Sequence, residues 1–177
     1  MTQRRCGDCT LCCKLVPVAD LNKAAGVRCK FQRHTGCAIY SRKPSACEIW
    51  SCMWLVGDDM GDMSRPDRSH YIIDPTPDYI VLRDRLTQNI DKIVVIQIWI
   101  DPRFPDAHRD PRLRAHLSKR RLPAIVRSSE TDVVCVLFPP ETAHDDEWHE
   151  VRTDLVKDQQ HDMADIVSVM QQQGIAP

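Results

Sequence analysis

Residues 6–13 read Cys-Gly-Asp-Cys-Thr-Leu-Cys-Cys, so two overlapping CxxC steps and a vicinal cysteine pair fall within one short stretch. A CxxC turn can aim two sulfur atoms at one cation about 2.3 Å away, and this spacing is typical of thiolate coordination. The chain has 177 residues and nine cysteines, of which all but Cys135 lie in the first 52 residues. The eight candidate metal ligands are Cys6, Cys9, Cys12, Cys13, Cys29, Cys37, Cys47 and Cys52.

Cysteine at this density has two common explanations: disulfides in an oxidising compartment, or thiolate ligation of metal in a reducing one. The opening residues MTQRRCGDCTLCCK contain no apolar segment of the kind found in a secretory signal. This favours a cytoplasmic protein whose thiols stay reduced. Metal ligation is therefore the preferred interpretation, and an oxidised disulfide scaffold is the alternative.

The vicinal pair Cys12 and Cys13 indicates how the ligands divide. Consecutive side chains diverge by about 100° in a helix and about 180° in a strand, so the two sulfurs are expected to face different centres. Eight thiols with one divergent pair suit two four-thiolate sites, or one cluster and a second site. A buried thiol without a metal is the alternative for Cys13.

A helix is predicted to begin at Ser45. The sequence from Ser45 to Glu48 fits an S-x-x-E capping box and follows Pro44, which places Cys47 in the first helical turn. The positive end of the helix dipole is expected to lower the pKa of the Cys47 thiol there. Cys52 either points away from Cys47 on the same helix or follows its end.

Charge is distributed unevenly along the chain, whose net charge is -1. Residues 1–52 carry nine Lys and Arg against three Asp and Glu, a net +6, whereas residues 53–177 carry fifteen against twenty-two, a net -7. Eight thiolates around two divalent cations add about -4, so the basic excess is expected to balance the metal–thiolate charge. The first segment also has few large apolar side chains, and we expect metal removal to unfold it while the remainder stays folded.

Three pieces of sequence form a recognisable pattern: CGDCTLCC (6–13), GCAIYSRKPSAC (36–47) and CMW (52–54). With Cys29 between them, they resemble the YkgJ-type cysteine-cluster family over about residues 4–56. Members of that family are described as zinc- or iron-chelating proteins with a CxxCxxCC motif and eight recurring cysteines. The resemblance implies that all eight cysteines named above chelate metal, with zinc or iron as the ion.

Some relatives carry a further cysteine where this chain has Gln32, which leaves the partition of the ligands open. The family has also been associated with N-methylation of flagellin lysines, but the chain shows no glycine-rich loop that would hold a methyl donor. The first hypothesis is a zinc-binding protein with closed thiolate sites. The alternative is an iron–sulfur protein with a redox or methyltransferase-associated role, in which three CxxCxxC thiols and one remote cysteine hold a 4Fe-4S cluster. Lys14 follows Cys13 where bacterial ferredoxins have proline, so that analogy is partial.

The rest of the chain predicts an α+β domain over residues 70–177, joined by a loop at 57–69 to a cysteine-rich, metal-stapled module at 1–56. The expected strands are a hairpin of 70–74 with 79–83, a central strand at 93–100, and a second hairpin of 124–127 with 133–138. Helices are expected from Asp110 to before Pro123 and from Ala143 to Gln173. The expected architecture is an antiparallel sheet of about five strands with packed helices.

Several functional classes find no support in the sequence. The longest apolar stretch, 93–100, is too short to span a membrane, and no catalytic triad, phosphate loop or HExxH motif is present, so enzymatic activity is left open. The basic helix after Asp110 has cations that complement its dipole and no interleaved aromatic residues, which argues against nucleic acid as a partner. His34 and His149 are expected at the surface and Cys135 in the core, and a protein partner is left unidentified.

Overall fold

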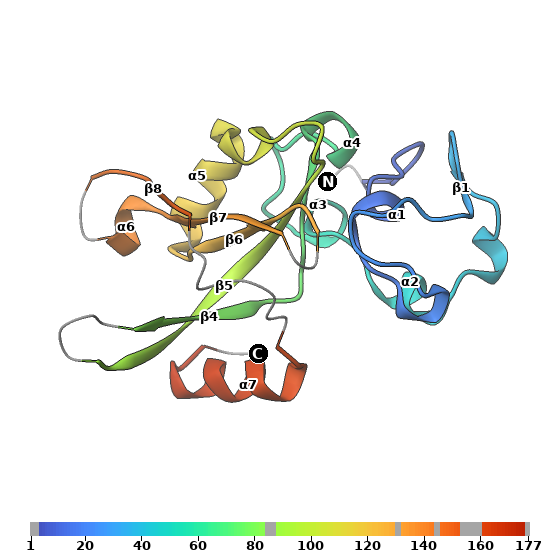
Figure 1. Cartoon of the computed structure of the whole chain (residues 1–177). Helices are drawn as coiled ribbons and strands as arrows, with labels where there is room; N and C mark the ends of the chain where they lie inside the picture. The colour runs from blue at the N-terminus through green and yellow to red at the C-terminus, as the bar shows by residue number, and fades with distance from the viewer. Residues whose placement is uncertain (1–3, 84–87, 130–131, 144–145, 153–160, 176–177) are drawn as a thin grey trace.

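The computed structural model describes residues 4–83, 88–129, 132–143, 146–152 and 161–175 (Figure 1). They form a mixed α/β structure with one six-stranded sheet and one two-stranded sheet. The cysteine-rich segment gathers at one end of the molecule, and the large sheet with its helices makes up the rest (Figure 1). None of the helices in the described ranges is long and apolar enough to cross a membrane.

Strand β5 (Ile90–Ile100) is the spine of the large sheet because it pairs with three other strands. β4 (Asp78–Arg83) is antiparallel to its first half, and β3 (Tyr71–Ile73) is antiparallel to its last three residues. Ile93 to Ile100 was expected as a central strand, and this prediction is confirmed, although the strand begins three residues earlier. A buried, β-branched run of this kind suits a strand covered on both faces.

The predicted hairpin of residues 70–74 with 79–83 is wrong. Strands β3 and β4 run in the same direction along β5, and each pairs with β5 rather than with the other. The break between them contains Pro75 and Pro77, which cannot donate to a ladder. At this break the Asp74 N–H donates to the Gln97 carbonyl at 2.9 Å, which keeps the interrupted edge attached to β5.

The sheet is not purely antiparallel. β6 (Ala124–Arg127) lies parallel to β5, because the chain between them includes helix α5 (Pro111–Arg120) and returns to the same end of the sheet. The other four pairings are antiparallel, including the confirmed hairpin of β6 with β7 (Val133–Phe138). Helix α5 is also confirmed: the Asp110 carboxylate caps it by accepting from the Arg112 N–H at 2.9 Å.

The long helix expected from Ala143 to Gln173 is wrong over its first part. A short helix α6 (Pro140–Ala143) is followed by strand β8 (His149–Val151), which pairs with β7 at the sheet edge. Residues 144–145 and 153–160 of the expected helix lie outside the described residues. Helix α7 (Met163–Gln172) forms the remaining part and packs through Ile166, Val169 and Met170 on β4 and β5.

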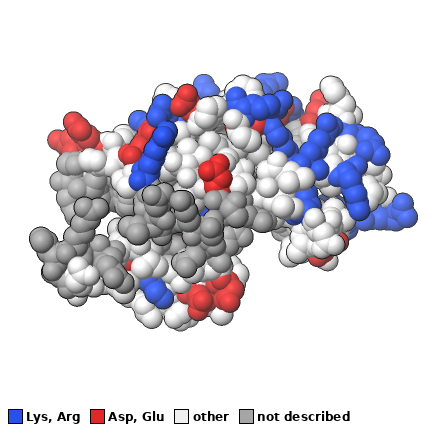
Figure 2. Space-filling model, in the orientation of Figure 1, with Lys and Arg blue, Asp and Glu red and all other residues white. Residues whose placement is uncertain are grey.

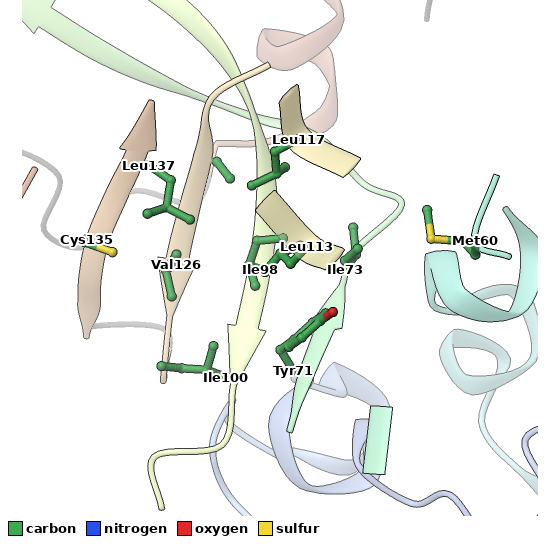
Figure 3. Packing of buried hydrophobic residues seen from close by; sticks show 11 residues of the cluster. Met60, Tyr71, Ile73, Ile98, Ile100, Leu113, Leu117, Val126, Cys135 and Leu137 are labelled. Carbon is green, nitrogen blue, oxygen red and sulfur yellow. The ribbon is translucent and has the colours of Figure 1, made fainter. Parts of the chain in front are cut away.

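The main core lies between α5 and one face of the sheet (Figure 3). Leu113 and Leu117 of α5 are fully buried against Ile98 and its neighbours on β6 and β7. Met60, from the stretch expected as a loop, is fully buried in the same cluster, and that stretch also contains helix α4 (Pro66–Ser69). The segment between the cysteines and the sheet is therefore anchored in the core.

The cysteine-rich end is built from very short elements. They are α1 (Cys12–Leu15), η1 (Ala19–Leu21), β1 (Gln32–Arg33), β2 (Gly36–Cys37), η2 (Tyr40–Arg42), α2 (Ser45–Ile49) and α3 (Met53–Val56). Its buried Leu11, Leu15 and Ala25 pack on Ile72 of β3 and Trp99 of β5. This end has little core of its own and completes one by sharing these two side chains of the sheet.

Candidate metal centre

The segment that carries all eight N-terminal cysteines, residues 6–52, lies toward one end of the molecule (Figure 1). Cys6 and Cys9 lie in one turn, where the Cys9 N–H donates to the Cys6 carbonyl at 2.9 Å. Cys12 and Cys13 begin α1, and the other four lie at the cysteine-rich end further along the chain. Cys135 lies apart on β7 in the core, where burial raises the pKa of its thiol to about 12. Its expected place in the core is confirmed.

Electrostatic contacts join Cys6, Cys9, Cys12 and Cys52 into a first group of thiols, called group I below. Burial, with smaller contributions from the charges of Cys6 and Cys9, raises the pKa of Cys52 to about 11. Cys12 in turn is affected by the charges of Cys9 and Cys52. Three members, Cys9, Cys12 and Cys52, pack beside the cluster of Leu15 and Trp99 at the junction with the sheet.

Cys13, Cys29, Cys37 and Cys47 form a second group, group II, on the other side of the vicinal pair. Burial raises the pKa of Cys47, and the charges of the other three members raise it further. The backbone ties the group together, since the Cys29 N–H donates to the Cys13 carbonyl at 2.8 Å. Cys37 lies on β2, opposite Gln32 of β1.

The vicinal pair connects the two groups. The thiols of Cys12 and Cys13 share a hydrogen bond, which raises the pKa of Cys12 well above its ordinary value and lowers that of Cys13 to about 7. Burial adds to the increase at Cys12 and opposes the decrease at Cys13. The two thiols are thus electrostatic neighbours, although their other neighbours differ.

The prediction that the helix dipole lowers the pKa of the Cys47 thiol is wrong. Helix α2 does begin at Ser45, but its N-cap residue is Pro44 and no side-chain cap is formed. The helix has five residues and a small dipole, so burial dominates and the pKa of Cys47 rises instead of falling. The helix ends at Ile49, so Cys52 follows its end, which was one of the two expected arrangements.

Lys23 is a polar neighbour of the thiols that the cysteine spacing alone does not reveal. Its side chain is buried, and its ammonium donates to the carbonyl of Val16 at 2.5 Å and to that of Ala24 at 3.2 Å. Burial lowers the pKa of Lys23, while nearby thiolate charge, first that of Cys29 and then that of Cys13, raises it. A buried cation here offsets negative charge on sulfur.

Arg65 and Asp67 contact the first turn of cysteines from a distant part of the chain. Arg65 donates to Asp67 at 2.6 and 2.8 Å and to the Cys6 carbonyl at 3.3 Å, and the Asp67 carboxylate is hydrogen-bonded to Cys9. Gly7 has φ +52°, and a Cβ there would lie 2.9 Å from the Arg65 guanidinium. The positive φ therefore favours glycine in this CxxC turn, and a larger residue would also displace the Arg65 side chain. The only sequence signal for the contact is the Arg-Pro-Asp run at residues 65–67, before and at the start of α4.

The thiols do not form a closed coordination shell. Across the described residues, which include every cysteine, no three Cys, His, Asp or Glu side chains converge closely enough to hold one ion. All nine cysteines are free thiols. Sulfur donors with a buried lysine beside them fit a thiolate-binding metal in their chemistry, but the sulfurs of each group would have to draw closer to coordinate it.

Comparisons of the chain with family models, with curated proteins and with solved structures return no match.

Proposed function

We propose that this protein binds metal through its eight N-terminal cysteines, with zinc as the principal ion and about two ions per chain, as eight thiolates at four per zinc imply. The cysteines of group I would hold one ion and those of group II the other. The observation that supports the proposal is that the eight thiols lie in one segment, where Cys52 has Cys6 and Cys9 as electrostatic neighbours and Cys47 has Cys13, Cys29 and Cys37.

The short elements around the thiols support this proposal. Helices α1, α2 and α3 have four or five residues each, so their cysteines can shift by small changes in loops rather than by breaking long helices. Four thiolates around one zinc form a closed site, whose contribution is to stabilise the fold rather than to activate water. The cysteine-rich end then packs against the large sheet through the cluster that contains Ile72 and Trp99.

A second candidate applies to group I alone. Its members are the three cysteines of CxxCxxC and the remote Cys52, which is the ligand pattern expected for a 4Fe-4S cluster. Such a cluster would give the protein a redox or methyltransferase-associated role. Group II would remain a zinc site in that case.

Anaerobic purification followed by elemental analysis tests both candidates. The zinc proposal predicts colourless protein with about two zinc ions per chain, whereas brown protein with acid-labile sulfide indicates the cluster. Protein that binds neither metal and has few titratable thiols would contradict both candidates and favour disulfides.

Substitution of one cysteine from each group tests the partition. Cys9→Ser and Cys29→Ser are each expected to leave about one ion per chain, because each removes a ligand from a different four-thiolate site. Cys135→Ala is the control and should leave the metal content unchanged. Cobalt(II) substitution reports the remaining site by its tetrahedral thiolate absorption. Loss of both ions in each single variant would contradict two separate sites.

A further inference from the structure

The stretch from residue 21 to residue 47 is strongly basic, because it contains six Lys and Arg and no Asp or Glu. Lys23 is buried, but the other five cations are exposed or half-buried. These five, called the basic surface below, are Arg28, Lys30, Arg33, Arg42 and Lys43. Figure 2 shows Lys and Arg side chains gathered over the end of the molecule formed by the cysteine-rich segment.

Within the described ranges, no cation of the basic surface forms an ion pair with a carboxylate. Arg33 donates instead to the backbone carbonyls of Lys30 and Gln32, which leaves its charge uncompensated. Helix α5 behaves differently, since Arg114 pairs with Glu150 at 2.5 Å and Arg120 with Asp59 at 3.1 Å. Two cations of α5 are thus paired with carboxylates, whereas within the described ranges the five cations of the basic surface have no carboxylate partner.

Two aromatic rings lie among these cations. Tyr40 is 71 % exposed, and the Lys43 ammonium lies 4.9 Å from its ring centroid. The Lys30 ammonium lies 5.2 Å from the ring centroid of the half-buried Phe31. A large exposed ring beside uncompensated cations can stack a nucleic-acid base while the cations contact the adjacent phosphates.

We propose that the basic surface, with Tyr40 and Phe31, binds single-stranded nucleic acid. A single strand is favoured over a duplex because bases must be unstacked to lie on an aromatic side chain. The combination of rings with cations favours nucleic acid over an acidic polypeptide, which would need the charges but not the rings. The sequence argued against nucleic acid only from the helix after Asp110, and in that helix Arg114 and Arg120 are paired with carboxylates. This binding activity goes beyond the proposed metal function and does not require it.

Fluorescence anisotropy of a labelled deoxythymidine 15-mer with the full chain, as purified, tests the proposal. We expect a dissociation constant below about 10 µM at 50 mM salt, with a slope of log K against log salt near -3, as about four phosphate contacts imply. The variant Arg28→Gln/Lys30→Gln/Arg33→Gln should weaken binding at least about tenfold and reduce the slope by about 2. Metal content and circular dichroism of each variant are measured in parallel, so that loss of binding is separated from loss of metal or of folding.

The matched control removes the same charge from α5 and from Arg121, the residue that follows it. The variant Arg112→Gln/Lys119→Gln/Arg121→Gln should bind the oligonucleotide within about threefold of the parent affinity. Cations far from the bound oligonucleotide add only a weak, screened attraction to its binding. Equal weakening by the two triple variants would overturn the proposal and indicate attraction by net charge alone.

Tyr40 separates stacking from charge. Tyr40→Ala should weaken binding about tenfold, whereas Tyr40→Phe should change it less than about twofold because the ring is kept. An unchanged affinity in Tyr40→Ala would contradict the proposal and favour an acidic protein partner. The same conclusion would follow if polyglutamate displaced the oligonucleotide as well as polyuridine does. Equal affinity for a duplex of the same length would also overturn it.

Discussion

The indole N–H of Trp50 donates a hydrogen bond of 3.1 Å to the buried carboxylate of Asp74, whose other oxygen accepts one of 3.0 Å from the indole of Trp99. Trp50 follows α2 in the cysteine-rich end, whereas Trp99 lies on β5. One carboxylate therefore holds both parts of the molecule. A second link, from Lys14 beside the vicinal cysteines to the buried Asp101 after β5, measures 2.5 Å.

Asp74→Asn is expected to lower the free energy of unfolding by about 1–3 kcal/mol, because the amide keeps one acceptor and turns a donor toward a buried indole N–H. Urea unfolding followed by circular dichroism measures the change. Asp91→Asn, at an exposed position near the start of β5, is the control and should change stability by less than about 0.5 kcal/mol. Equal effects of the two substitutions would show that Asp74 does not hold this junction.

Gly7→Ala is expected to destabilise the cysteine-rich end by about 1 kcal/mol or more, because the residue has a positive φ and the new Cβ would meet Arg65. Limited trypsin digestion of the metal-loaded protein measures the effect as faster cleavage after Arg28 and Arg33. Gly61→Ala serves as the control, since a Cβ there meets nothing within 4 Å. The same digestion rate in both variants would contradict the preference for glycine at position 7.

Metal removal by a strong chelator is expected to unfold residues 1–52 and leave the large sheet folded, because the cysteine-rich end has little core of its own. Proteolysis should then cut within this end and spare the sheet, and circular dichroism should lose only part of its signal. Zinc added back should restore protection. Unchanged proteolysis after complete metal removal would contradict a stabilising role for the metal.

Glu150 gives the protein an acid-sensitive contact at the sheet edge. Hydrogen bonding from Arg109 lowers the pKa of this carboxyl, and although burial opposes the decrease, the charges of Arg109, His108 and Arg114 add to it. A lowered folded-state pKa contributes stability above the unfolded-state pKa of about 4.3, and this contribution is lost as pH falls through the lower folded-state pKa.

Glu150→Gln should therefore lower the free energy of unfolding by about 1 kcal/mol near neutral pH and flatten its dependence on pH below about 4. Urea unfolding at several pH values measures this dependence. An unchanged acid slope in Glu150→Gln would show that other carboxyl groups carry it.

Local signals in the sequence predicted the elements that depend on neighbouring residues. Asp110 with Pro111 predicted the start of α5, and the polar turn after Arg127 predicted the hairpin of β6 and β7. Pairings between distant segments were harder to predict. Pro75 and Pro77 suggested a chain reversal, but they interrupt an edge that continues along β5.

The last helix shows a different failure. Trp148 and Val151 have helical spacing with later apolar residues, yet the segment around Glu150 completes the sheet, where Arg109 and Arg114 satisfy its carboxylate. The parallel pairing of β5 with β6 had a usable signal, because a strand–helix–strand order favours a parallel crossover.

Of the residues in the candidate site, the sequence predicted only the cysteines. Spacing identified the eight ligand candidates and suggested two centres, and the division of thiol neighbours is in keeping with that expectation without testing it. Arg65 and Asp67 were missed because contacts across dozens of residues leave no mark on local spacing. Lys23 was missed because cysteine spacing does not show which lysine is buried beside the thiols. The pKa of Cys47 was predicted in the wrong direction because burial outweighs the dipole of a five-residue helix.

The shared packing of Trp99 gives the molecule an internal optical reporter. This indole is 1 % exposed beneath Leu11 and Leu15, and its N–H is held by the same carboxylate that holds Trp50. Detachment of the cysteine-rich end would bring both indoles into water and move their fluorescence emission to longer wavelength. Attachment of the cysteine-rich end to the sheet can thus be followed in the intact protein by tryptophan emission, without attaching a dye.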